Sequence, residues 1–281
     1  MASAKPQRRL VVNADDFGRS KSINAAVIAA HQRGILTTAS LMVAGGSADE
    51  AVELAKENPR LGVGLHLTLS NGKALLPASA IPRLVNCRGQ FSDSPVRAGI
   101  KYFFSREAQS QLAAEIAAQF ERFAATGLAL DHVNGHLHFH LHPSIFTILL
   151  TQFKRWNVRA LRLTNDPLLI DWPLGEGRWF YRASHAFIFK VLARRAERLM
   201  RGCGIAHASC VFGLLENGRV NESYVLRLMG KLPEGESELY SHPSLDEFRH
   251  EYEALISLKV LEAVRTADVE LIRYQDLWRN C

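Results

Sequence analysis

Four histidines at alternate positions give this chain its densest group of reactive side chains. His136, His138, His140 and His142 lie within seven residues and make up more than a third of the 11 histidines. Alternate side chains of a strand share a face, so an extended segment would point at least three imidazoles the same way. Imidazole is the commonest protein metal ligand and titrates near neutral pH, which indicates metal binding or acid–base chemistry. The alternative is a polar loop with capping histidines before a helix that starts at Pro143.

Two adjacent carboxylates follow the first apolar run of the chain. Asp15 and Asp16 come after residues 9–13, which we expect to form a short strand. Adjacent carboxylates just past a buried strand repel each other unless a cation or a hydrogen-bond donor compensates. Because neighbouring side chains point in different directions, one could ligate a metal while the other faces a substrate. Capping of a helix ahead of Ser20 is the plainer alternative.

Strand-like and helix-like segments alternate along the whole chain. This alternation is typical of a parallel α/β sheet with right-handed crossovers. Seven or so such units in this length favour a barrel, and an open sheet remains the alternative. We expect strands over residues 9–13, 40–43, 62–69, 128–134, 160–163, 206–211, 237–240 and 269–272, and helices over 23–33, 47–57, 107–126, 143–156, 222–229 and 247–264.

The unusual polar residues fall at the expected strand ends. In parallel barrels the carboxyl ends of the strands gather on one face, where the loops form the active site. One carboxylate and two imidazoles there would suit zinc, iron, nickel or manganese, whereas magnesium prefers oxygen ligands. A core role for His66 and simple packing of Arg162 are the alternatives. The residues at these ends are Asp15, Asp16, His66, His136, His138, Arg162 and His242.

Length and composition indicate a globular protein. The 281 residues are 47% hydrophobic and suit one barrel-like domain over residues 1–281, since no linker forces a division into two. Four scattered cysteines without a Cys-x-x-Cys pair suit a reducing cytoplasm. We find no signal peptide and no apolar run long enough to span a bilayer, so a cytoplasmic location is expected. A Pro- and Gly-punctuated excursion over residues 70–98 is long enough to be functional.

The net charge of +6 is concentrated in one segment, residues 180–201. Six basic residues stand there against Glu197 alone, and the first half of the segment is apolar and aromatic. A basic, apolar helix can lie on an anionic membrane or meet a lipid-bearing substrate, so we expect peripheral contact with the inner membrane face. An ordinary packed helix with a solvated basic end is the alternative. No nucleic-acid-binding motif is present, so nucleic acid is not an expected partner.

Four motifs carry a family resemblance that covers about residues 8–275. In them the chain resembles the YdjC-like carbohydrate deacetylases, relatives of the polysaccharide deacetylases. The resemblance implies a distorted seven-stranded, TIM-like barrel and a metal-dependent hydrolase that removes the acetyl group from an N-acetylglucosaminyl substrate. The motifs are Asn13–Gly18, Gly64–Thr68, Asp131–His138 and Ser241–Pro243.

Further stretches resemble the hopanoid-biosynthesis-associated branch of this family (HpnK). That branch is expected to deacetylate an N-acetylglucosaminyl hopanoid, leaving a free glucosamine head group. The stretches are Ser40–Gly45, Leu76–Val85, Ala98–Phe104, Leu130–Asn134 and His140–Pro143.

The resemblance also implies roles for individual residues. Asp16, His66 and His136 would ligate one divalent ion, for which the ligand set favours zinc, with Mg, Mn, Ni and Fe as alternatives. Asp15 would be the general base, and His242 would act as acid or polarise the substrate.

Other residues would support this set or line the site. Arg162 could hold Asp15 ionised. His138, His140 and Asn13 would support the site or contact substrate. Many relatives carry an aspartate where this chain has Asn134, which leaves the orientation of His136 without its usual partner.

Other functions fit parts of the same pattern. A deacetylase of soluble chitooligosaccharides is the nearest alternative, and a metal-dependent phosphoesterase is a more distant one. Phosphoesterases with a His-x-His site usually place it at the first strand, whereas here it follows the fourth. A non-catalytic carbohydrate- or lipid-binding module would not need two adjacent aspartates. A homodimer is compatible with all of these.

Overall fold

A curled, parallel seven-stranded sheet organises the protein in the computed structural model, which describes residues 8–278. Six strands follow the order β4-β3-β2-β1-β6-β5, and the seventh, β7, pairs with the first half of β1. Every pairing is parallel, which confirms the α/β barrel-like class. The strands are β1 (Arg8–Phe17), β2 (Thr38–Leu41), β3 (Gly62–Leu67), β4 (Leu130–Gly135), β5 (Cys210–Phe212), β6 (Gly235–Ser241) and β7 (Val269–Ile272).

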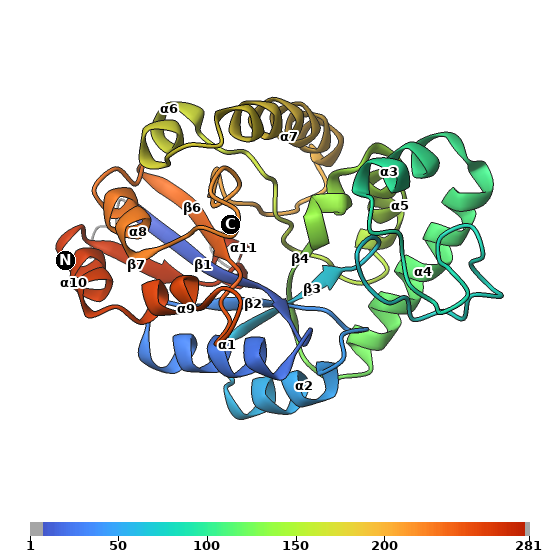
Figure 1. Ribbon diagram of the computed structural model, residues 1–281, viewed down its shortest axis with the longest axis horizontal. Coiled ribbons are helices and arrows are strands. Elements are labelled where there is room, and N and C mark those ends of the chain that lie inside the picture. The colour runs from blue at the N-terminus through green and yellow to red at the C-terminus, as the bar shows by residue number, and fades with distance from the viewer. Residues whose placement is uncertain (1–7, 279–281) are drawn as a thin grey trace.

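Helices surround this sheet. In Figure 1, α1 and α2 lie along one side of it, α6 and α7 along the opposite side, and α3 to α5 beyond β3 and β4. Short 3-10 helices, η1 (His136–Leu141) and η2 (Trp172–Leu174), complete the elements. The helices are α1 (Lys21–Arg33), α2 (Ala48–Glu57), α3 (Pro95–Phe104), α4 (Arg106–Ala124), α5 (Pro143–Phe153), α6 (Leu168–Asp171), α7 (Trp179–Met200), α8 (Glu222–Met229), α9 (Arg249–Ile256), α10 (Leu258–Thr266) and α11 (Gln275–Trp278).

The expected strand over residues 160–163 is wrong. Leu161 and Ala160 form only isolated parallel bridges, to Val133 of β4 and to Ala206. The segment then turns, because the Asn165 N–H donates to the Leu163 carbonyl. Single bridges from β4 through Leu161 and Ala160 to Ala206, which precedes β5, therefore replace a full strand, and this distorts the barrel.

Two helical expectations also need correction. The helix expected over residues 247–264 is two helices, since the chain breaks at Ser257, whose hydroxyl accepts from the Val260 N–H and caps α10. No helix was expected at residues 95–104, but α3 begins within the expected 70–98 excursion and ends after it. The other expected helices are confirmed to within a few residues.

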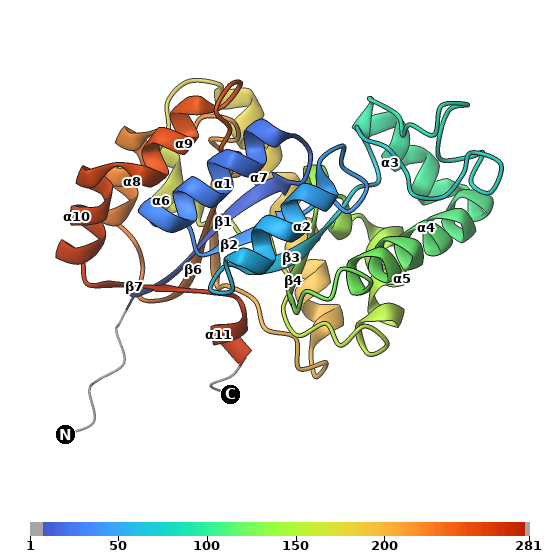
Figure 2. The same ribbon diagram turned by 90° about the horizontal axis from the view of Figure 1, so that it is seen from below.

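The excursion after β3 is anchored to the neighbouring helices. The buried Glu115 carboxylate of α4 accepts from the Leu75 and Leu76 backbone N–H groups. The buried Tyr102 hydroxyl of α3 donates to the Leu69 carbonyl. Figure 2 shows this loop and α3 together above α4, at one flank of the barrel. The contacts hold α3 beside the carboxyl ends of β3 and β4.

Within residues 8–278, no helix combines the length and apolarity that crossing a membrane requires.

Candidate metal and acid–base site

A β-bulge near the end of β1 presents both aspartates. Asp15 and Asp16 lie within β1 rather than after it. The register between β1 and β2 shifts between Ala14 and Phe17, and Asp16 has a left-handed φ of 65°. A bulge of this kind re-aims a side chain beside a strand end. Both carboxylates are thereby buried at the carboxyl end of the sheet. Asp16 contacts His66 and His136, whereas Asp15 contacts Arg162.

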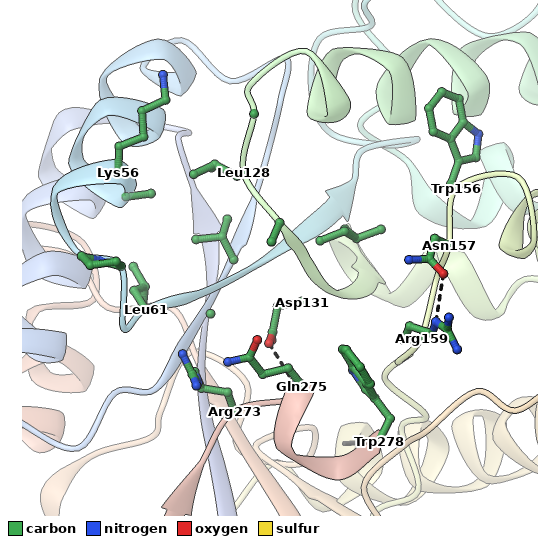
Figure 3. A pocket seen from close by; sticks show the side chains of 17 residues that line it. Lys56, Leu61, Leu128, Asp131, Trp156, Asn157, Arg159, Arg273, Gln275 and Trp278 are labelled. Carbon is green, nitrogen blue, oxygen red and sulfur yellow. Dashed lines mark hydrogen bonds between the residues drawn. The ribbon is translucent and has the colours of Figure 1, made fainter. Parts of the chain in front are cut away.

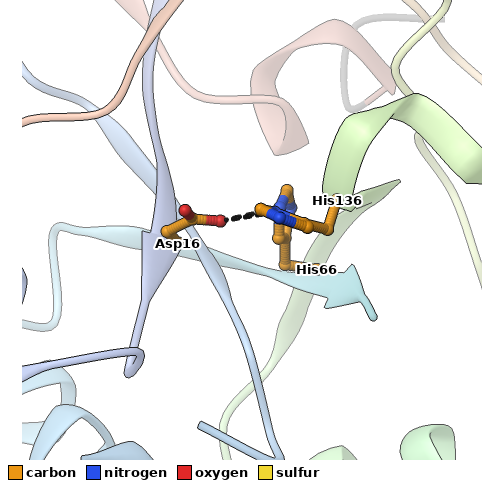
Figure 4. Close-up of side chains that lie close together, drawn as sticks. All are labelled: Asp16, His66 and His136. Carbon is orange, nitrogen blue, oxygen red and sulfur yellow. Dashed lines mark hydrogen bonds and ion pairs between the residues drawn. The ribbon is translucent and has the colours of Figure 1, made fainter. Parts of the chain in front are cut away.

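Asp16, His66 and His136 form a cluster in which one ligand atom from each side chain lies within 4.8 Å of the other two. Figure 4 shows the two imidazoles, from β3 and η1, converging on the Asp16 carboxylate of β1. His136 Nδ1 lies 2.9 Å from Asp16 Oδ1, and His66 Nε2 lies 3.3 Å from the same oxygen. Arg19 donates to the other oxygen, Oδ2, at 2.8 Å. Asp16 Oδ1 is therefore the oxygen available to a cation.

The surroundings of His66 fit a metal ligand. Its Nδ1 lies 2.7 Å from Asn134 Oδ1, an amide oxygen that can only accept, so Nδ1 carries the proton. In the neutral imidazole Nε2 then carries the lone pair, and it has no hydrogen-bond partner although the side chain is buried. A second group that fixes the tautomer of a metal-binding histidine is a regular feature of metal sites. Asn134 thus orients His66, and not His136 as the resemblance suggested.

Charge around the cluster favours a cation. Burial alone would raise the pKa of Asp16, but His136 and His66 outweigh it and lower that pKa well below its usual range. Burial alone would lower the pKa of His66, but Asp15 and Asp16 outweigh it and raise that pKa. A site that draws protons onto a buried histidine is one where a divalent ion gains the same attraction.

Asp15 is held by donors on both oxygens. The fully buried Arg162 donates from Nη1 to Asp15 Oδ2 at 2.6 Å and from Nη2 to Oδ1 at 3.0 Å. The side-chain amides of Asn13 and Asn134 donate to Oδ1 at 2.8 and 3.0 Å. Burial would raise the pKa of Asp15, but Arg162 and then His66 lower it far below its usual range. Asp15 is ionised at neutral pH and fixed in one orientation.

Two residues that sequence reasoning missed complete this arrangement. Glu238 of β6 is fully buried and accepts from Arg162 Nε at 2.9 Å. The Tyr274 hydroxyl donates to the other Glu238 oxygen. Arg162 therefore bridges two buried carboxylates, which balances part of their charge. A glutamate next to Leu239 and Tyr240, within the strand expected over residues 237–240, was the signal that could have identified Glu238.

The histidine run does not form an extended face. Leu137 and His138 have left-handed φ values of 51° and 57°, so the chain coils through η1 and sends each imidazole in a different direction. His140 Nε2 lies 3.0 Å from the Arg162 carbonyl, beneath the site, and its pKa is lowered to about 3, mainly by burial. His142 is the N-cap residue that precedes α5, and its Nε2 contacts the Gly99 carbonyl of α3. Only His136 reaches the cluster.

His138 and His242 border the reactive groups. His138 Nε2 lies 3.0 Å from the Tyr240 hydroxyl, and burial lowers the pKa of His138 well below its usual range. His242 follows β6, is partly exposed, and has its Nδ1 3.9 Å from Glu251 of α9. The buried Glu251 also accepts from the His242 backbone N–H. Glu251, another residue that the sequence analysis missed, fixes the loop that carries His242.

A cavity of about 370 Å³ gives access to this site. Its floor is polar, with Asp15, His66 and His242 among its residues, and its wall is apolar. Val96 of α3 and Phe189 of α7 stand on that wall. Within residues 8–278, neither lysine nor arginine lines it.

A larger cavity, of about 510 Å³, lies at the opposite end of the barrel, where β3 and β4 begin. Figure 3 shows two hydrogen bonds there, from the Gln275 backbone N–H to Asp131 and from the Arg159 side chain to Asn157. It contains none of the candidate residues. Because barrel chemistry belongs to the carboxyl ends of the strands, the smaller cavity is the candidate site.

A buried Ser–His–Asp chain lies beneath the site. Ser40 Oγ is 2.9 Å from His132 Nε2, and His132 Nδ1 is 3.0 Å from Asp131. The geometry resembles a catalytic triad, but the serine and the histidine are fully buried and neither lines the 370 Å³ cavity. Ser40 instead accepts from Asn13 and Asn134 at 2.9 and 2.8 Å, which fixes the two amides that hold Asp15.

A distorted parallel barrel with an aspartate and two histidines clustered at its strand ends defines a class of α/β protein that can hold a metal ion. The model of the YdjC-like protein family matches residues 9–268, and the chain belongs to that family. A carbohydrate deacetylase of Clostridium beijerinckii is 28% identical over 273 residues, which cover 96% of this chain and 100% of that protein.

Two other relatives match over a shorter stretch. A carbohydrate deacetylase of Brevibacillus brevis is 40% identical over 53% of this chain and 57% of its own length. A chitooligosaccharide deacetylase of Serratia marcescens is 36% identical over 57% of this chain and 61% of its own. The chain thus spans little more than half of these two proteins.

A solved structure shares the fold. It is described as a candidate cellobiose-phosphate cleavage protein of Enterococcus faecalis V583, and it matches with a TM-score of 0.75 at 22% identity, over 97% of this chain and 99% of that one.

Proposed function

We propose that this protein is a metal-dependent hydrolase that removes the N-acetyl group from an N-acetylglucosaminyl substrate, giving acetate and a free amine. The observation that carries the proposal is the pairing of two adjacent aspartates with separate partners. Asp16 joins the cluster with His66 and His136, and Asp15 is held ionised at the cavity floor. Deacetylase relatives at 28 to 40% identity support the reaction class.

One divalent ion held by Asp16, His66 and His136 would activate water and polarise the acetamide carbonyl. Two imidazoles and one carboxylate favour zinc over magnesium in such a place, and manganese, nickel and iron remain compatible with the same ligands. The unpartnered Nε2 of His66 is the structural feature that fits such an ion.

Asp15 acts as general base in this proposal. The oxygen of water forms a bond to the acetamide carbon, and its proton passes to the Asp15 carboxylate. Arg162 keeps Asp15 ionised beforehand and fixes its direction. The low pKa of Asp15 makes it a weak base, so the proton that it accepts is readily released again.

His242 is a proton donor for the departing amine in this proposal. As the carbon–nitrogen bond breaks, the nitrogen takes up a proton, which comes from His242 or from protonated Asp15. Glu251 holds the loop that places His242 at the cavity. His138, with Tyr240, borders the same floor as a neutral imidazole that can contact the substrate. Asn13 and His140 act from beneath, through Asp15 and Arg162.

The finer proposal for the substrate is a glycosylated hopanoid, as the branch resemblance implies. The apolar wall of the cavity supports a substrate with an apolar portion next to the sugar. A soluble chitooligosaccharide is the second candidate, because the Serratia marcescens relative carries that name. A phosphoester is less suitable, since no lysine or arginine of the described part of the chain lines the cavity to pair with phosphate.

Acetate release from N-acetylglucosaminyl lipid and from chitooligosaccharides, with and without a chelator, tests the function. We expect release that chelation stops and zinc restores. Asp15→Asn should bind metal as the wild type does and release no acetate. No acetate from either substrate with the metal-loaded protein would overturn the proposal, and normal turnover by Asp15→Asn would remove Asp15 as the base.

A further inference from the structure

Two helices beside the cavity expose large apolar side chains. On α3, Val96, Ile100, Phe103 and Phe104 are between 51 and 78% exposed. On α7, five large apolar side chains are between 49 and 72% exposed. Single exposed apolar residues are ordinary, whereas a group of them marks an interaction surface. The α7 residues are Trp179, Phe180, Phe187, Ile188 and Val191.

Both helices leave most of their large apolar residues at the surface. The buried positions of α7 include Ala186, Ala193 and Ala196, while Trp179, Phe180 and Phe187 are exposed. On α3 the buried residues are Ala98 and Tyr102. A helix that served only the core would place its large apolar residues against the barrel. The outward apolar face of each helix is therefore suited to a partner outside the protein.

The two apolar faces meet at the mouth of the candidate site. Val96 of α3 and Ile188 of α7 line the same 370 Å³ cavity as Asp15 and His242. Between the helices, His142 contacts the Gly99 carbonyl of α3. In Figure 1, α7 lies along the top of the view and α3 to its right. Whatever covers these faces also lies over the entrance to the site.

The same two helices carry unpaired positive charge. Helix α3 has Arg97 and Lys101 and no acidic residue, and α7 has five basic residues against Glu197. Among residues 8–278, Arg97, Lys101, Arg194 and Arg198 are exposed and form no ion pair with an acid. Cations that flank an apolar face complement the anionic headgroups of a lipid surface. A second copy of this chain, in contrast, would bring like charges together across a two-fold interface.

We propose that α3 and α7 together dock the protein on an anionic lipid bilayer, with the aromatic side chains in the interface and the cavity mouth facing the lipid. The sequence indicated only the basic segment of residues 180–201, and α3 supplies the second half of the surface. Docking is independent of the chemistry, and it rests on the proposed function only for the identity of the group that enters the cavity.

Vesicle flotation tests the docking directly. Purified full-length protein is mixed with vesicles of phosphatidylcholine alone or of phosphatidylcholine with phosphatidylglycerol. We expect flotation with the anionic vesicles, weakened by salt because the screening length shortens. The variant Phe104→Ser/Phe180→Ser removes one aromatic from each helix and should lower the bound fraction about tenfold or more. Neither residue lines the cavity.

Matched variants separate the contributions. Leu258 of α10 is 81% exposed on another helix, so Leu258→Ser should float as the wild type does. Arg194→Gln/Arg198→Gln should reduce binding to anionic vesicles and leave any binding to neutral ones unchanged. Circular dichroism checks that each variant is folded.

The outcomes distinguish docking from function. Equal flotation of wild type and Phe104→Ser/Phe180→Ser, or no flotation at all, overturns the docking proposal. So does a dimer in solution that the double variant dissociates, since a second copy would then occupy the surface. Acetate release from a water-soluble substrate should be equal in wild type and double variant. If the wild type floats but releases no acetate, only the proposed function fails.

Discussion

Asn134 connects both halves of the candidate site through one side chain. Its oxygen fixes the tautomer of His66, and its nitrogen donates to Asp15. From the sequence, Asn134 stands where many relatives have an aspartate. An amide serves here because it accepts and donates at once, which a carboxylate beside the ionised Asp15 could not do without repulsion.

Replacing Asn134 by leucine should therefore weaken metal binding. Without its acceptor, His66 loses the contact that leaves Nε2 bare, and a loss of about 10–100-fold in Zn²⁺ affinity is expected. Competition with a chromophoric chelator measures the affinity. Asn165→Leu, at an exposed asparagine outside the site, is the control and should not change it. Equal affinity for wild type and Asn134→Leu would show that the contact does not support the ligand.

Arg162→Met should lower the free energy of unfolding by about 3–5 kcal/mol, since it leaves Asp15 and Glu238 as buried, uncompensated charges. Urea denaturation measures the change. Arg83→Met breaks the exposed pair with Glu107 and should cost less than about 1 kcal/mol. Adding Glu238→Gln to Arg162→Met should recover part of the loss. A loss no greater than that of Arg83→Met would contradict the charge argument.

At the scale of elements, two turns position Asp16. The turn after β1 packs on the turn after β2, where the Ser47 N–H donates to the Gly18 carbonyl. Gly45 makes the close approach: a Cβ there would lie 2.3 Å from the Gly18 carbonyl oxygen. At the next residue, Gly46, a Cβ would lie 3.7 Å from its nearest neighbour, which is ordinary contact.

Gly45→Ala should consequently cost about 1–3 kcal/mol and displace the bulge that carries Asp16. Gly46→Ala should stay within about 0.5 kcal/mol of wild type. Thermal unfolding compares the two variants, and metal content reports on Asp16. Indistinguishable unfolding of the two variants would mean that the turns can separate without cost.

Local pattern explains which elements the sequence could predict. Apolar runs and caps were sufficient for β1 to β4 and for α1, α2, α4, α5 and α8. Helix α3 was not predicted because most of its large apolar residues face solvent, so its sequence lacks the usual apolar stripe of a helix that packs on the core. The short bridges at Ala160 and Leu161 depend on the gap between two distant strands, which no local pattern encodes.

The candidate site divides in the same way. Asp16, His66 and His136 were predicted from strand ends and motifs, and the structure brings them together. Glu238, Tyr274 and Glu251 act through contacts with residues elsewhere in the chain, so their roles required the tertiary arrangement. The uniform histidine face failed because left-handed residues at Leu137 and His138 interrupt the strand period.

At the scale of the whole molecule, buried neutral histidines tie stability to pH. Burial lowers the pKa of His140 to about 3 and that of His138 well below its usual range. Both stay neutral in the folded protein while the unfolded chain takes up protons below about pH 6.5. The contribution of these two neutral histidines to the free energy of unfolding is therefore complete above pH 6.5 and is lost as the pH falls toward 3. His66 does not oppose this loss, because its raised pKa keeps it protonated in both states over that window.

Each such histidine should add about 1.4 kcal/mol per pH unit to the slope of the unfolding free energy between about pH 6 and 4.5. Above about pH 4.5 the carboxylates with lowered pKa values are ionised in both states, so they do not contribute to that slope. His140→Gln keeps a donor for the Arg162 carbonyl but cannot titrate, and it should flatten the slope by about that amount. His250→Gln, at an exposed histidine, should leave the slope unchanged. Denaturant unfolding across this range, with a chelator in every sample so that metal release does not contribute, measures both variants. If His140→Gln and wild type lose stability in parallel, His140 takes up its proton without unfolding, and the barrel beneath the site admits charge.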